Sequence, residues 1–322
     1  MINSIADLHP LHSPVERETA PAPFPLRITI ELSAACNLSC IMCPRKYAAL
    51  SGGFMERGLF EKIVDELSAH EVEAVVPFFR GEALLHPDFL GMITLLRKRT
   101  PARIQLATNA LLLTPALSKA LLDIGIDFIS FSLDAVRRET YEKIRVGGDF
   151  DRAMENVHTF LAMRKHTVPC RTVVQVSATE SLQNEKELLE FIRFWTGRVD
   201  RVRIYPRHSE KGRYGRLAQA AQRRPEGSRG PCRKPFSEFV IYADGQAALC
   251  NHDWDRKRTD PLGSIRDQGI EAIWNGDNYA KIRQNHVAHK WQALSPCGLC
   301  DHWQAWEEGE FHIGTLVEGV PG

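Results

Sequence analysis

The stretch LRITIELSAACNLSCIMC, residues 26–43, places three cysteines directly after a β-type run at residues 26–32. The cysteines are Cys36, Cys40 and Cys43, in C-x3-C-x2-C spacing. Iron–sulfur clusters are held by cysteine thiolates, and three thiolates on a four-iron cluster leave one iron open to another molecule. A zinc loop and a set of buried thiols are the alternatives. A zinc loop needs a fourth ligand nearby, and residues 44–69 contain no Cys or His, so the spacing favours an iron–sulfur cluster.

Strand-like and helix-like segments alternate from residue 26 onward. Short apolar runs typical of buried strands are found at 26–32, 73–79, 103–109, 127–135, 171–179 and 199–207. Segments with apolar residues at helical spacing lie at 54–70, 87–100, 114–125, 139–146, 150–166 and 184–197. This alternation predicts a parallel sheet covered by helices, either an open barrel or a doubly wound sheet. Both architectures place their active sites at the carboxyl ends of the strands.

The composition is that of an ordinary soluble globular protein. Of 322 residues, 43% are hydrophobic and 25% are charged, and 41 Lys and Arg against 40 Asp and Glu give a formal net charge of +1. This balance predicts no nucleic-acid partner, and no apolar run reaches the roughly 18 residues that span a bilayer. The N-terminus lacks the pattern of a signal peptide, so we expect a cytoplasmic chain with no membrane partner. In that compartment, clustered cysteines indicate metal or redox chemistry rather than disulfides.

Changes of pattern divide the chain into five parts. They are a flexible, Pro-rich N-terminal segment (1–25), the alternating domain (26–207), a Gly- and Arg-rich linker (208–230), a smaller domain (231–310) and a C-terminal tail (311–322). Within the smaller domain, residues 237–250 predict a β-hairpin that turns at Asp244-Gly245. Residues 264–276 predict a helix with a Ser start and a Gly stop.

A second group of cysteines belongs to the smaller domain: Cys232, Cys250, Cys297 and Cys300. The last two form a C-x2-C pair, a spacing common to zinc sites and to iron–sulfur clusters. Four thiolates would ligate a cluster completely, which suits electron transfer or structure rather than substrate binding. The zinc and cluster interpretations both remain open on the residues alone.

Cysteines in this arrangement, after the first strand of a partial barrel, resemble the radical S-adenosylmethionine (radical SAM) superfamily. In that family the amino and carboxylate groups of SAM chelate the open iron of a 4Fe-4S cluster. One electron from the cluster cleaves SAM to methionine and a 5′-deoxyadenosyl radical, which takes a hydrogen atom from the substrate. The resemblance therefore implies a partial (β/α)6 TIM-like barrel that binds a 4Fe-4S cluster and SAM.

Further motifs of the resemblance lie at the ends of successive predicted strands. Gly81 and Glu82 are similar to the central residues of the family's GGEP motif, which binds the SAM amino group. The other positions that the resemblance assigns to SAM are Thr108, Asn109, Ser132, Asp134, Gln175 and Ser177, with the ribose contact expected at Ser132-Leu-Asp134. Two departures stand out: Arg80 and Ala83 replace a Gly and a Pro of GGEP, and Met42 replaces an aromatic residue that many members carry.

The hairpin from Gly245 to Cys250 is similar to the G-x4-C motif of the SPASM and twitch domains, which are accessory domains of radical SAM enzymes. Four cysteines with one C-x2-C pair match the shorter twitch form, which holds one auxiliary 4Fe-4S cluster. The resemblance thus implies that the barrel is followed by a small α+β twitch or SPASM-like domain with a second cluster.

Candidate catalytic residues are Tyr205, near the end of the sixth predicted strand, and His252 and Asp253, just after Cys250. Either of the last two could accept the proton of a substrate alcohol, although a polar cluster at the end of the hairpin is an equally good interpretation. Cys170 precedes the fifth predicted strand and therefore lies opposite the site, where a small buried side chain is the better interpretation.

Three functions follow from these patterns. The first is hydrogen-atom abstraction from a small polar metabolite, such as a carbohydrate, an aminocyclitol or a nucleoside, for oxidation or epimerisation in a biosynthetic pathway. The radical SAM resemblance implies an external one-electron reductase of the flavodoxin or ferredoxin type as a partner. The second is modification of a ribosomal peptide or of a protein side chain. The third is a non-catalytic iron–sulfur electron-transfer protein, which would gain nothing from an open iron.

Overall fold

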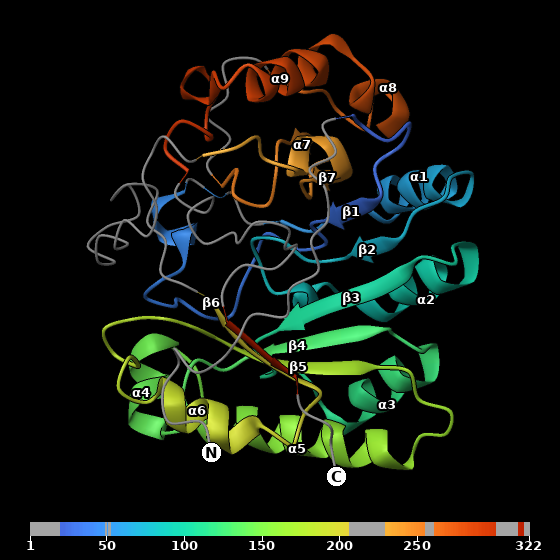
Figure 1. Ribbon diagram of the computed structural model, residues 1–322. Helices are drawn as coiled ribbons and strands as arrows, with labels where there is room; N and C mark the ends of the chain where they lie inside the picture. The colour runs from blue at the N-terminus through green and yellow to red at the C-terminus, as the bar shows by residue number, and fades with distance from the viewer. Residues whose placement is uncertain are drawn as a thin grey trace.

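The computed structural model describes residues 20–48, 50, 53–205, 229–254, 261–300 and 315–318. In these residues, strands form one sheet and helices pack along it (Figure 1). Most of the predicted linker at 208–230 lies outside the described residues.

The sheet has the strand order β8-β7-β1-β2-β3-β4-β5-β6-β9. Its parallel strands are β1 (Arg27–Ile30), β2 (Ala74–Val76), β3 (Arg103–Thr108), β4 (Phe128–Ser132), β5 (Val173–Thr179), β6 (Arg201–Tyr205) and β7 (Glu238–Ile241). The edge strands β8 (Ala247–Ala248) and β9 (Thr315–Glu318) are antiparallel to their neighbours. The carboxyl ends of the parallel strands therefore meet at one edge, and most of the predicted site residues lie at or just beyond these ends.

Helices connect the parallel strands. They are α1 (Arg57–Ser68), α2 (Phe89–Arg99), α3 (Pro115–Ile124), α4 (Arg138–Ile144), α5 (Phe150–His166) and α6 (Leu188–Trp195). Thr114 caps α3 by accepting the Leu117 N–H, and Gly125 ends the helix with a φ of 75°. Buried apolar side chains of the helices and of the strands share one core.

The two faces of the sheet differ in polarity. Successive strand residues point to opposite faces, and the apolar set, which includes Ile129, Val174 and Val202, joins the helices in the core. The alternate positions are also buried but carry polar side chains, namely Ser130, Gln175, Ser177 and Arg203. A doubly wound sheet would have helices over both faces. The open, TIM-like barrel is therefore the correct alternative, and its inner face is polar along β4, β5 and β6.

The C-terminal region continues this sheet. β7 pairs in parallel with β1, and the predicted hairpin then turns at Gly245, which has a φ of 93°. The helix predicted at 264–276 is shorter, since α8 spans Ile270–Trp274, and α9 (Asp277–Val287) was not predicted. Gly276 explains the error, because its extended backbone makes it the N-cap of α9 as well as the end of the preceding segment. Shorter turns are η2 (Pro44–Tyr47), η3 (Ala83–Leu85), α7 (Lys234–Ser237) and η5 (Trp291–Ala293).

Parts of both predicted terminal segments have fixed positions. Phe24 is buried and stacks on the ring of His70, with 3.8 Å between the ring centroids. Trp274 Nε1 donates a hydrogen bond to the carbonyl oxygen of Ala22 at 2.8 Å. Ala22 and Phe24, at the end of the predicted N-terminal segment, therefore contact the folded part of the chain. In the predicted tail, β9 pairs with β6, which the short sequence TLVE did not reveal.

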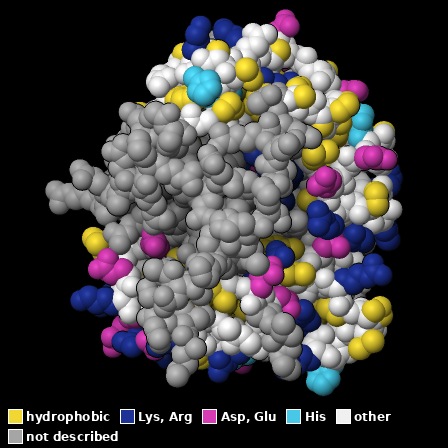
Figure 2. Space-filling view, viewed as in Figure 1, with side chains coloured by type: hydrophobic (Ala, Val, Ile, Leu, Met, Phe, Trp, Pro, Cys, Tyr) yellow, Lys and Arg dark blue, Asp and Glu magenta, His cyan; other side chains and the backbone are white. Residues whose placement is uncertain are grey.

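The described surface shows mixed charge. Figure 2 shows Lys and Arg side chains interspersed with Asp and Glu over the described part of one face, as the net charge of +1 suggests. No helix within the described ranges is long and apolar enough to cross a membrane.

The Trp274 hydrogen bond gives a test of the N-terminal anchor. We expect Trp274→Phe to be about 1 kcal/mol more destabilising than Trp195→Phe. Both indoles are fully buried, but Trp195 Nε1 has no hydrogen-bond partner among the described residues. The comparison therefore separates the hydrogen bond from the lost ring area. Urea unfolding of both variants measures the difference, and equal free energies of unfolding would contradict the anchor.

Candidate functional site

The first three cysteines lie in the loop between β1 and η2. Ser39 N–H donates to Val146 O and Ile41 N–H donates to Ile144 O, both at 2.9 Å. The loop is thereby attached to the end of α4 and to the residues that follow it. Cys36, Cys40 and Cys43 are half-buried free thiols.

Burial dominates the electrostatics of these thiols. It raises the pKa of Cys36 and of Cys43, and it raises the pKa of Cys40 to about 11. The neighbouring thiols Cys36 and Cys43 raise the pKa of Cys40 further, which shows that the three side chains gather. Three thiolates here would be buried negative charges that need positive charge close by, and the iron ions of a cluster supply it. The donor set thus fits the implied 4Fe-4S cluster.

Gly81 and Glu82 pack against the start of this loop. A Cβ on Gly81 would lie 2.2 Å from Ser33 O and 2.3 Å from Ala35 O, so only glycine fits. Glu82 N–H donates to Ala35 O at 2.8 Å. The two central residues of the GGEP-like motif are therefore held against the backbone that leads to Cys36.

The Glu82 carboxylate is buried and accepts hydrogen bonds from neutral donors. Thr108 Oγ1 donates to it at 2.8 Å and the Asn109 backbone N–H at 2.9 Å, so the structure brings these three predicted residues together. The pKa of Glu82 is raised, mainly because the carboxylate is buried. Asn109 Nδ2 also donates to Asn37 Oδ1 at 2.9 Å, which ties the end of β3 to the cysteine loop. A cationic group bound here would offset the cost of burying the carboxylate.

The buried Asp134 carboxylate forms an ion pair with Arg145. Arg145 Nη2 lies 2.6 Å from Asp134 Oδ2, and the Thr179 N–H donates to Asp134 Oδ1 at 2.6 Å. Arg145 Nη1 also lies 3.9 Å from Cys40 Sγ. Sequence reasoning missed this arginine, because a single Arg after a short helix carries no motif. The guanidinium places positive charge beside the first cysteine site.

The other predicted SAM residues lie along the inner face of β4 and β5. Ser132 is paired with Ser177 in the register of the two strands. Gln175 Nε2 donates to Ser130 Oγ at 3.0 Å, and Ser130 Oγ lies 3.4 Å from Ser177 Oγ. At the end of β6, Tyr205 is 38% exposed and continues the same face at the mouth of the barrel.

The second group of cysteines is assembled from three segments. Burial raises the pKa of Cys232 and Cys250, and Cys297 raises that of Cys250 further, so these thiols are neighbours. The Cys300 N–H donates to Cys297 O at 3.2 Å, which closes the C-x2-C turn. Within the described ranges, no three His, Cys, Asp or Glu side chains converge as ligands of a single metal ion do.

Polar side chains surround this second group. Cys232 N–H donates to His286 Nδ1 at 3.3 Å, and Arg229 Nη2 donates to Cys297 O at 2.9 Å. Burial lowers the pKa of His286 to about 4. The buried Lys234 ammonium lies 2.6 Å from Glu238 Oε2. Sequence reasoning gave Arg229 and Lys234 no role at this site, since Arg229 contacts the backbone and the pairing of Lys234 with Glu238 four residues later is common in helices.

The candidate proton acceptors lie in the turn that follows Cys250. The Asp253 carboxylate accepts the Leu249 N–H at 3.1 Å and is buried, so it holds the turn together. The His252 N–H points to Cys250 Sγ at 3.4 Å. Cys170 is half-buried and precedes β5, at the end of the barrel opposite the site.

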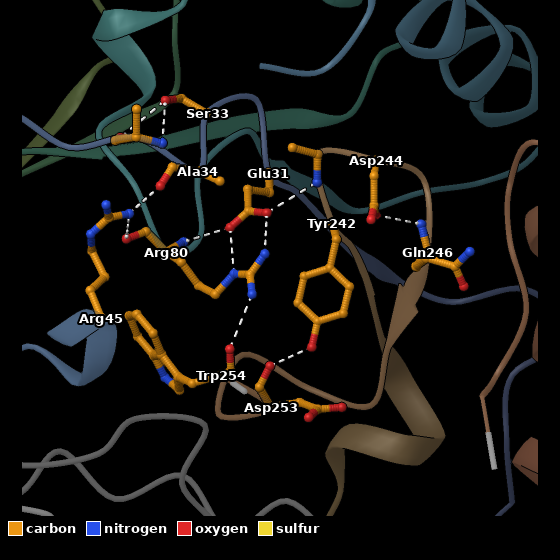
Figure 3. A network of polar contacts seen from close by, with 12 residues as sticks. Glu31, Ser33, Ala34, Arg45, Arg80, Tyr242, Asp244, Gln246, Asp253 and Trp254 are labelled. Atoms are coloured by element: carbon orange, nitrogen blue, oxygen red, sulfur yellow. Dashed lines mark hydrogen bonds and ion pairs between the residues drawn. The ribbon is translucent and has the colours of Figure 1, made fainter. Parts of the chain in front are cut away.

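Arg80, the first departure from GGEP, belongs to a buried ion pair (Figure 3). Its Nε and Nη2 each donate to the Glu31 carboxylate at 2.7 Å, and the Ala243 N–H donates to the same carboxylate at 3.0 Å. The second departure, Ala83, is buried in the core.

Comparison with known families gives two matches. The Radical SAM superfamily profile matches residues 30–193, which is half of the chain. The profile of SPASM, an iron–sulfur cluster-binding domain, matches residues 232–301. The matched ranges contain all seven cysteines of the two sites.

Curated relatives differ in how much of their length the chain spans. A tungsten-containing aldehyde ferredoxin oxidoreductase cofactor-modifying protein of Pyrococcus furiosus is 27% identical over 84% of this chain and 87% of its own length. The mycofactocin maturase MftC of Mycobacterium tuberculosis is 25% identical over 85% of this chain but 60% of its own length.

Solved structures share the fold. A crystal structure of BtrN in complex with AdoMet and 2-DOIA matches with a TM-score of 0.60 and 18% identity, over 89% of this chain and 98% of BtrN. SuiB of Streptococcus suis bound to the precursor peptide SuiA matches with a TM-score of 0.67 and 15% identity, over 82% of this chain and 67% of SuiB. At these identities, the likeness supports the fold alone.

The close contact at Gly81 predicts a loss of SAM affinity. In Gly81→Ala, the new Cβ must displace the backbone before Cys36, and we expect at least about tenfold weaker SAM binding. Gly58→Ala is the matched control, because a Cβ on Gly58 in α1 meets nothing within 4 Å. Equilibrium binding of SAM to the anaerobically reconstituted variants measures the effect. The account of Gly81 fails if the two variants bind SAM equally well.

Proposed function

Because the chain belongs to the radical SAM superfamily, we propose that it abstracts a hydrogen atom from a small polar metabolite, as an oxidoreductase. The substrate class that we propose is a carbohydrate, an aminocyclitol or a nucleoside, oxidised or epimerised in a biosynthetic pathway. The observation that carries this proposal is that the buried polar row on the inner face of the barrel continues beyond the positions assigned to SAM, to Arg203 on β6. Burying hydroxyl, amide and guanidinium groups is costly unless they are hydrogen-bonded, so such a lumen suits a ligand rich in hydroxyl or amino groups.

Two groups that the matched domains imply would set the chemistry. A 4Fe-4S cluster with SAM would supply the means to remove a hydrogen atom from carbon, and an auxiliary cluster would serve as an electron acceptor. Cys36, Cys40 and Cys43 would hold the first cluster. Cys232, Cys250, Cys297 and Cys300 would hold the second.

We assign the SAM ammonium to Glu82. Its carboxylate is fixed by Thr108 and by the Asn109 N–H, yet a carboxylate has about four acceptor positions and can take further donors. Burial raises the pKa of Glu82, and an ammonium group would favour its ionised form. Arg145, beside Cys40, would pair with an anionic group of the ligand at the same site.

Asp134, Ser132, Gln175 and Ser177 would bind the polar nucleoside part of SAM. Asp134 is already oriented by Arg145 and by the Thr179 N–H. Tyr205 at the barrel mouth is the candidate that we place in contact with the substrate. We propose His252 as the proton acceptor ahead of Asp253, because the Asp253 carboxylate accepts the Leu249 N–H within its own turn.

A flavodoxin- or ferredoxin-type reductase in the cytoplasm would supply the electron that starts each reaction. Free, clustered thiols and iron–sulfur clusters fit a reducing compartment. The second candidate function is modification of a peptide. Specific comparisons favour it, since MftC is a maturase and SuiB binds a precursor peptide.

The release of 5′-deoxyadenosine from SAM distinguishes these functions. We expect one class of sugars, aminocyclitols or nucleosides to stimulate release by the reduced, reconstituted protein about tenfold or more over the substrate-free rate. The Cys36/Cys40/Cys43→Ala variant should release none and serves as the control. Stimulation by peptides alone would replace the proposal with peptide modification. No release under any condition would support the electron-transfer alternative.

A further inference from the structure

The side chain of Arg80 contacts two segments that are distant in sequence. Two of its nitrogens bind Glu31, and the third, Nη1, donates to the carbonyl oxygen of Trp254 at 3.1 Å. Its guanidinium carbon lies 4.2 Å from the ring centroid of Tyr242, and the Tyr242 hydroxyl donates to Asp253 O. Arg80 and the Tyr242 ring that it stacks on therefore bind two successive carbonyl oxygens, those of Trp254 and Asp253 (Figure 3).

These carbonyls belong to the turn at residues 249–254, which we call the Cys250 turn. The Asp253 N–H donates to Cys250 O at 3.0 Å, and the Leu249 N–H donates to the Asp253 carboxylate. The His252 N–H points to Cys250 Sγ. Because the turn is closed by these bonds, the position of its carbonyls determines the position of the Cys250 sulfur.

The backbone of Arg80 belongs to the first site instead. Arg80 O accepts a hydrogen bond from Arg45 Nη1 at 3.3 Å, and the same nitrogen donates to Ala34 O. Arg45 lies two residues after Cys43, and Gly81 follows Arg80 in close contact with the same loop. One residue thus contacts the first cysteine loop through its backbone and the Cys250 turn through its side chain.

We propose that Arg80 is a positioning residue that fixes the Cys250 turn, and with it the second cluster, relative to the SAM site. The proposal rests on the assignment of Cys250 as a ligand of that cluster. Arginine is required because its planar guanidinium binds a carboxylate through two nitrogens and donates in a third direction. Lysine at this position would satisfy the charge of Glu31 but could not reproduce all three hydrogen bonds.

Arg80→Lys therefore separates charge from position. In this variant we expect the SAM-dependent EPR signature of the first cluster to stay as in the wild type. We expect the EPR signal of the second cluster to change in shape and its midpoint potential to rise. A loosened turn admits water, which stabilises the extra negative charge of the reduced cluster. The expected shift is about tenfold in the ratio of oxidised to reduced cluster at fixed potential, which is 59 mV for one electron.

Arg97→Lys is the matched control. The Arg97 guanidinium also contacts a carboxylate, that of Asp127, and two carbonyls, Gly125 O at 2.9 Å and Ala102 O at 3.3 Å. These contacts lie at the amino ends of β3 and β4, opposite the site. Arg97→Lys should thus weaken a similar set of contacts and leave the signals and potentials of both clusters unchanged.

The outcomes separate positioning from mere stability. A shifted signal, or loss of the second cluster, in Arg80→Lys but not in Arg97→Lys supports the proposal. Wild-type signals and potentials in Arg80→Lys would overturn it. If Arg80→Lys does not fold, Glu31→Gln/Arg80→Met removes both charges of the pair, and unchanged second-cluster spectra there would overturn it as well. If the wild-type protein holds only one cluster, Cys250 is not a ligand of a second cluster. An iron count tests this assignment independently of the Arg80 variants.

Discussion

Three of the buried carboxylates at the carboxyl edge of the parallel sheet, Glu31, Glu82 and Asp134, organise the site through the partners that each one has. Glu31 pairs with Arg80, and Asp134 pairs with Arg145. Glu82 accepts its hydrogen bonds from neutral donors among the described residues, namely Thr108 and two backbone N–H groups. A buried carboxylate that lacks a bound cation is suited to a cationic ligand. Among the described residues, Arg145 lowers the pKa of this carboxylate through space, and the ammonium of SAM would add a positive charge in direct contact with it.

The sheet also determines how the two cysteine sites are related. β7 pairs directly with β1, so the strand that leads to the second site lies beside the strand that leads to the first. Glu31, just past the end of β1, accepts hydrogen bonds both from Arg80 and from the Ala243 N–H after β7. The SPASM-matching region is therefore joined to the barrel by strand pairing and by a buried ion pair, and not by the chain connection alone.

Sequence patterns predicted much of this arrangement. Hydrophobic alternation predicted a parallel sheet covered by helices, and the resemblance to the radical SAM superfamily predicted the barrel. The strand-end motifs placed Glu82, Thr108 and Asn109 at one edge of the sheet, where they meet. What they missed depends on contacts that local patterns do not encode. Arg145 and Arg80 act through carboxylates 11 and 49 residues away. Gly276 both ends one segment and caps the next helix, and Phe24 joins the core and stacks on His70. Gln175 and Ser177, which alternate with apolar residues along β5, are assigned to the SAM site by the family resemblance.

The most direct test of the two-site account is the iron and sulfide content of the anaerobically reconstituted chain. The account predicts about eight irons per chain in the wild type and about four in the Cys36/Cys40/Cys43→Ala variant, because each site would hold one four-iron cluster. About four irons in the wild type and none in the variant, with zinc bound in both, would contradict it. The second site would then be structural, and it could not accept an electron from the substrate.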